Sequence, residues 1–193
     1  MKIWVLHDSI YGNDEYLSRI LAKELSREHE VKIGYICNIA PKSMVEEHPD
    51  MIIFGSAIRF WEHTRNLKEW FKRYVQLMKH AKRRLSYTFL YFTHVKPKTK
   101  IAKHARNAMR TLKKSGIIDN IFYECVSAKV KTIEGPLCEG VEERFKTIAK
   151  ELSEWLNGKP LEEIRADHVS IEESLSQFSL ARWFFHFSKP VVG

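Results

Sequence analysis

The chain has few cysteines and no long apolar run, and each absence excludes some classes of protein. Its 193 residues include three cysteines, Cys37, Cys125 and Cys138, which are far apart and lack the spacing of metal ligands. An odd number of scattered thiols is typical of a reduced protein, so we expect the protein to be cytoplasmic. No apolar segment is long enough to span a bilayer, and the N-terminus does not have the pattern of a signal peptide.

Acidic residues are missing from the middle of the chain. None lies between Glu69 and Asp119, although the net charge of the whole chain is only +8. The interval contains fourteen basic residues: Lys72, Arg73, Lys79, Lys82, Arg83, Arg84, Lys96, Lys98, Lys100, Lys103, Arg106, Arg110, Lys113 and Lys114. One side of the molecule should therefore carry a positive field that attracts phosphates, acidic proteins or nucleic acid. An ordinary solvated lysine surface explains the same pattern.

Short apolar runs alternate with helical patterns along the chain. The runs predict strands over residues 2–6, 31–36, 50–54, 86–92 and 118–128. Apolar residues at three- and four-residue steps predict helices over residues 14–27, 66–78, 99–115 and 141–156, with a shorter piece at 43–47. This alternation predicts an α/β fold with a doubly wound, five-stranded parallel sheet that is covered on both faces.

Ligands of such sheets bind at the carboxyl ends of the strands, so three loops are candidates for a site. They span residues 7–14, 55–64 and 93–99. The first loop contains a hydroxyl residue, a glycine and an amide, Ser9, Gly12 and Asn13, and leads directly into a helix. A helix N-terminus presents unpaired backbone N–H groups and a positive dipole, which suits a phosphate.

These loops resemble those of flavodoxin-like proteins. The run Asp8-Ser9-Ile10-Tyr11-Gly12-Asn13 resembles the family's phosphate loop, and Gly55-Ser56-Ala57-Ile58-Arg59-Phe60-Trp61 resembles its second flavin loop. The following run, Asn66 to Phe71, resembles the start of its third helix. The resemblance covers roughly residues 1–157 in element order and spacing. It implies the strand order 2-1-3-4-5 in a domain of residues 1–158, followed by a C-terminal extension of residues 159–193.

The resemblance implies FMN binding, with the redox step performed by the flavin and no catalytic acid or base from the protein. By position, Ser9, Ile10, Tyr11, Gly12 and Asn13 would hold the phosphate. The ring would lie along Ser56, Ala57, Ile58, Arg59, Phe60 and Trp61, and close to Thr93 and His94. Stacking on Phe60 or Trp61 would shield the ring from water. The alternative is that these two aromatics pack beneath their loop or form a dimer contact.

Two features depart from the family pattern. Asp14 stands where the family usually has a phosphate-binding threonine. Its carboxylate would repel an anion. Either Asp14 is the N-cap of the first helix, or it points away while the other loop groups bind the phosphate. The third loop, residues 93–100, is basic and contains no aromatic residue. His94 in this loop would bond the polar edge of the ring, donate a proton during quinone reduction, or simply be solvated.

These features lead to two predictions of function. The first is an FMN-dependent redox protein that uses a redox partner protein or a quinone-like or anionic substrate. The second is a flavin-free binding module whose basic face, residues 72–114, binds an acidic protein or nucleic acid. A hydrolase ranks last, because the chain lacks a glycine-flanked serine and a metal-ligand cluster. The aromatic residues at 183–187 predict packing on the domain's own surface or self-association into a homo-oligomer.

Overall fold

The computed structural model describes residues 1–59, 62–63, 65–95 and 98–164, without the side chains of 59, 62–63, 98–101 and 123–125. Residues up to Ser153 form one compact unit, and residues from Glu154 on belong to a second. The predictions for Phe60, Trp61 and the aromatic segment at 183–187 lie outside the described residues.

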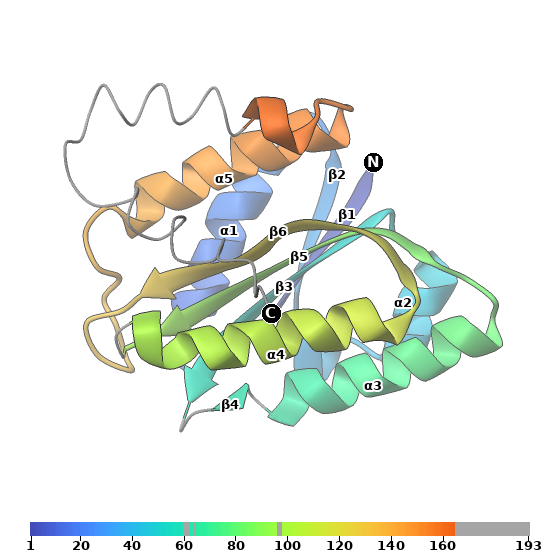
Figure 1. The fold of residues 1–193 in the computed structure, drawn as a ribbon, viewed down its shortest axis with the longest axis horizontal. Coiled ribbons are helices and arrows are strands. Elements are labelled where there is room, and N and C mark those ends of the chain that lie inside the picture. The colour runs from blue at the N-terminus through green and yellow to red at the C-terminus, as the bar shows by residue number, and fades with distance from the viewer. Residues whose placement is uncertain (60–61, 64, 96–97, 165–193) are drawn as a thin grey trace, which may run out of the picture. The chain divides into compact units, whose positions relative to one another are not determined.

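The core of the first unit is a parallel sheet (Figure 1). Its strands are β1 (Lys2–Asp8), β2 (Glu30–Tyr35), β3 (Met51–Arg59), β5 (Leu85–His94) and β6 (Ile118–Lys129). They pair in the order β2-β1-β3-β5-β6, and the short β4 (Glu62–His63) pairs antiparallel with the end of β3. Without β4 this is the predicted order 2-1-3-4-5, so the doubly wound parallel sheet is confirmed.

Helices cover both faces of the sheet (Figure 1). One face carries α1 (Asn13–Leu25) and α5 (Val141–Leu156). The other carries α2 (Pro41–Glu47), α3 (Arg65–His80) and α4 (Lys98–Ser115). A single 3₁₀ turn, Ile36–Asn38, joins β2 to the segment before α2.

The amphipathic pattern of α3 determines which side of the helix is buried. Its apolar face, which includes Leu67, Trp70 and Tyr74, is buried as predicted. The Trp70 and Tyr74 rings stack with centroids 5.1 Å apart, and Trp70 Nε1 donates a hydrogen bond of 2.6 Å to the Ile39 carbonyl. The indole is thus buried without leaving its N–H unpaired.

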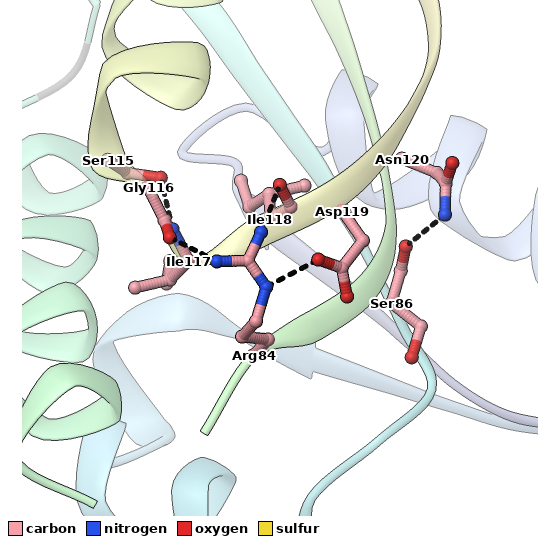
Figure 2. Close-up of polar contacts among 8 residues, drawn as sticks. All are labelled: Arg84, Ser86, Ser115, Gly116, Ile117, Ile118, Asp119 and Asn120. Carbon is pink, nitrogen blue, oxygen red and sulfur yellow. Dashed lines mark hydrogen bonds and ion pairs between the residues drawn. The ribbon is translucent and has the colours of Figure 1, made fainter. Parts of the chain in front are cut away.

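The turn between α4 and β6 is held by Arg84, the residue immediately before β5 (Figure 2). Gly116 ends α4 with φ of 71°, in the left-handed conformation predicted for this position. The Arg84 guanidinium pairs with Asp119 and donates to the carbonyls of Gly116 (2.7 Å) and Ile118 (3.4 Å). One side chain therefore links the entry of β5 to that of β6.

The predicted ends of two strands are wrong, because both strands continue further than the sequence indicates. Residues 55–59 were expected in a loop, but β3 continues through Arg59, and β5 continues through His94. The two extensions pair with each other, Gly55 with Tyr91 and Ala57 with Thr93. Pairing with a neighbouring strand gives these small and polar residues a strand conformation that their own sequence does not favour.

Candidate functional site

The loop after β1 meets the N-terminus of α1 at the carboxyl edge of the sheet. Gly12 is the N-cap of α1, with φ of 84°, a conformation that glycine adopts without strain. As a glycine, it provides no side-chain cap for the helix. The interpretation of Asp14 as the N-cap is wrong, since Asp14 is the second residue within α1. The first backbone N–H groups of an α-helix have no partner within the helix, and those of α1 lie beside this loop.

Two carboxylates are buried at this end of the sheet. Asp8, the last residue of β1, is fully buried, and its Oδ1 accepts a hydrogen bond of 3.2 Å from Asn66 Nδ2 at the start of α3. Asp14 is also buried, with 1 % of its surface exposed. Negative charge in the first turn of a helix is favourable, so Asp14 complements part of the dipole that would attract an anion.

The Tyr91 side chain lies beneath the loop and connects β5 to α1. Its hydroxyl donates to the Asp14 backbone carbonyl at 2.8 Å, and it lies 2.8 Å from Ser18 Oγ. Burial, and then the charge of Asp14, raise the pKa of Tyr91 well above its usual value, so the hydroxyl stays protonated. The ring passes over Gly55 in the adjacent strand, where a Cβ atom would lie 2.2 Å from the hydroxyl oxygen.

A small cavity of about 30 Å³ lies where the strand ends converge. It is lined by Ser9, Tyr11, Asn13, Asp14, Ala57, Ile58, Thr93, His94, Val95, Val130 and Ile133. Nine of these residues come from the three predicted loops. The cavity is about the size of one water molecule, whereas pockets for cofactors occupy about 300–1,000 Å³.

Other predicted site residues do not line the cavity. Ile10 is 59 % exposed, next to Tyr11, which lines the cavity and is 45 % exposed. Ser56 is fully buried within β3. The side chain of Arg59, with Phe60 and Trp61, lies outside the described residues.

His94 and Thr93 are buried at the end of β5. They are 2 % and 3 % exposed, so the expectation of a solvated histidine is wrong. His94 belongs to the strand rather than to the basic loop, and its carbonyl accepts the N–H of Val130 at 2.9 Å. The extension of β5 beside β6 therefore places this imidazole in the interior.

The comparisons with known proteins agree on the fold. No family model matches the chain, and no curated protein does. Among solved structures, flavodoxin 1 from Bacillus cereus is 14 % identical with a TM-score of 0.61, covering 83 % of this chain and 100 % of that one. The rubredoxin:oxygen oxidoreductase from Desulfovibrio gigas is 17 % identical with a TM-score of 0.61, covering 81 % of this chain and 36 % of that one. This chain has the flavodoxin-like fold.

The flavodoxin-like domain has a fourth loop at the carboxyl edge, which the sequence predictions missed. The segment after β6 places the Ile133 carbonyl 3.2 Å from Asn13 Nδ2, which donates to it. Gly135 lies so close to the same side chain that a Cβ atom would be 2.8 Å from Asn13 Oδ1. The rule that ligands bind at strand ends, applied to the fifth predicted strand, would have included this segment.

The site of this flavodoxin-like domain fits the phosphate of FMN through its backbone more than through its side chains. Gly12 at the N-cap and the backbone N–H groups of the first turn of α1 suit an anion. The described side chains around the cavity include the carboxylate of Asp14 and neither lysine nor arginine.

Among the described residues, no helix has both the length and the apolar character needed to cross a membrane.

Proposed function

We propose that this protein is an FMN-binding redox protein whose phosphate loop is Ser9–Asn13. The observation that carries the proposal is Gly12 at φ of 84°, an N-cap residue without a side chain that opens α1 at the carboxyl edge of the sheet. Flavodoxin-like sheets bind FMN where the strand order reverses, between the first and third strands. The loop after β1 occupies this position.

The backbone N–H groups of the first turn of α1 and the Ser9 hydroxyl would donate to the phosphate. Ser56 to Trp61 would lie along the ring, with Phe60 or Trp61 as the stacking face, and Thr93 and His94 at its edge. When bound, the flavin supplies the electron or hydride transfer. The basic segment between Glu69 and Asp119 suits an acidic redox partner or an anionic or quinone-like substrate.

Asp14 would limit the affinity for FMN. Its carboxylate is in the first turn of α1, where an anion at the N-terminus would meet its negative charge. We expect Asp14→Thr to tighten FMN binding about five-fold, because removing such a charge is worth roughly 1 kcal/mol. The measurement is a titration of the purified protein with FMN, followed by the quenching of flavin fluorescence.

Two variants control this titration. Glu15→Gln removes a charge from the same turn, but Glu15 is bonded to Arg19 at the surface, so its effect should be smaller. Gly12→Val places a β-branched residue at positive φ and should abolish binding. If neither the wild-type protein nor Asp14→Thr binds FMN at millimolar concentration while both are folded, the proposal is rejected.

A second candidate is a flavin-free binding module, and the narrow cavity beside Asp14 favours it. Its binding surface would be the outer face of α4, where Arg106, Arg110, Lys113 and Lys114 are exposed. Such a surface would bind an acidic protein or nucleic acid through its field. This candidate requires salt-dependent binding to polyanions and no affinity for FMN.

A further inference from the structure

A much larger pocket, of about 500 Å³, lies between α3, α4 and the sheet. It shares no lining residue with the small cavity at the strand ends. Its floor contains three aromatic rings from three elements, Phe54 of β3, Phe71 of α3 and Phe92 of β5. These rings are at most 8 % exposed, and the volume is within the range of pockets that bind small molecules.

The lining on the α4 side includes a small side chain. Ala108 contributes only a methyl group to the pocket. The pocket is open to the surface, where Lys68 and Lys103 are exposed. Binding of an apolar molecule would be favourable, because contact with that molecule removes the apolar lining from water.

The charged side chains among the described lining residues have one sign. Lys68 of α3 and Lys103 of α4 are exposed lining residues from the two facing helices, and His104 is a third basic one. None of the described lining residues is acidic. An apolar floor with ammonium groups on both helices complements a molecule with an apolar body and one anionic group.

We infer that this pocket is a binding site for a small aromatic anion, such as an aromatic carboxylate or sulfonate. The aromatic body packs on the three phenylalanine rings, and the anionic group lies between Lys68 and Lys103. The site is independent of the proposed FMN site, so it stands whether or not the protein binds flavin.

The test compares two fluorescent probes that share one aromatic body. 8-Anilinonaphthalene-1-sulfonate carries an anionic group, and N-phenyl-1-naphthylamine is the same body without it. We expect the sulfonate to bind the full-length protein at one site. Lys68→Ala and Lys103→Ala should each weaken its binding about five-fold and leave the uncharged probe unchanged. The controls Lys72→Ala and Lys113→Ala remove exposed charges from the same helices outside the pocket, and should have no such effect.

Filling the pocket tests the position of the site. Ala108→Trp should abolish binding of both probes while thermal unfolding remains cooperative, and Ala81→Trp, at an exposed position, should not. Should Ala108→Trp fail to fold, Ala108→Leu is measured in its place. The inference is overturned if the probes still bind to Ala108→Trp. It is also overturned if neither Lys68→Ala nor Lys103→Ala weakens binding of the sulfonate. FMN titration of the same variants distinguishes the sites, because it should be unchanged in all of them.

Discussion

The packing beneath the candidate site leaves no room for a side chain at Gly55. A Cβ atom there would lie 2.2 Å from the Tyr91 hydroxyl and 2.3 Å from its Cζ, within a fully buried ring. We expect Gly55→Ala to destabilise the protein by about 2 kcal/mol, because the ring must shift and lose its bonds to α1. Urea denaturation measures the loss.

Gly34→Ala is the matched comparison for Gly55→Ala. Its Cβ atom would lie 2.8 Å from Ile39 Cγ1, but Ile39 is only partly buried, beside the edge strand β2. Ile39 can move towards solvent, so the loss should be smaller. An equal loss in the two variants would contradict the role assigned to Tyr91.

His7 makes stability depend on pH. The side chain is 6 % exposed, and burial is the main cause that lowers its pKa from the usual 6.5. The unfolded chain therefore takes up a proton at a higher pH than the folded one, and stability is lost as the pH falls below about 6.5. We expect the free energy of unfolding to decrease between pH 7.5 and 5.5, and to decrease less in His7→Asn.

The pH range in which His7 acts lies above the usual Glu pKa of 4.5. Surface carboxylates whose pKa values are lowered by ion pairs, such as Glu69 beside Arg65, therefore do not contribute to the change in stability over this range. His29, whose pKa is also lowered mainly by burial, accounts for part of the remaining slope. The exposed His80→Asn is the control, and an equally reduced slope in this control would exclude the explanation by burial.

At the scale of elements, the ends of the strands are where sequence and structure differ most. The residues Gly55, Ser56 and Ala57 are small or polar, as is typical of a loop. In the structure these residues pair with 91–93 of β5, and the two strands end together. Local sequence does not encode this pairing, because each of these residues pairs with a residue 36 positions further along the chain. The α4 and α5 patterns, by contrast, predicted helices that the structure confirms to within one residue.

The junction of α4 and β6 depends on Arg84 (Figure 2). We expect Arg84→Ala to lower the free energy of unfolding by about 1 kcal/mol, because it removes an ion pair and two bonds to backbone carbonyls. Arg65→Ala is the control, since its single exposed pair with Glu69 within α3 is worth only a few tenths of a kcal/mol, roughly 0.3. If the two losses measured by urea denaturation are equal, Arg84 does not stabilise the junction.

At the scale of the whole molecule, the segment without acidic residues includes exposed basic residues on α4, namely Arg106, Arg110, Lys113 and Lys114. If the second candidate function holds, the affinity for a 20-base-pair DNA duplex should fall steeply as salt is raised, with a slope set by the number of phosphates contacted. Replacing Arg106 and Arg110 with glutamine should reduce this slope by about 2, at roughly 0.9 per contact. The measurement is fluorescence anisotropy at several salt concentrations.

Lys42→Gln is the control for the DNA titration. Lys42 is 78 % exposed on α2, outside the basic segment, and its removal should leave the slope unchanged. Binding that is absent, or that does not respond to salt, would eliminate the second candidate and leave the FMN proposal as the one to pursue.

The sequence by itself predicted the helices and the loops at the carboxyl edge, because apolar spacing and loop residues are local properties of the chain. The strand order came from the resemblance to flavodoxin-like proteins. Only the tertiary structure decided that Asp14 and His94 are buried, that Tyr91 reaches α1 across Gly55, and that α3 and α4 enclose a pocket. Each of these features depends on side chains from elements far apart in sequence. Burial and cavities arise from how such elements pack against one another, which the spacing within a single element does not specify.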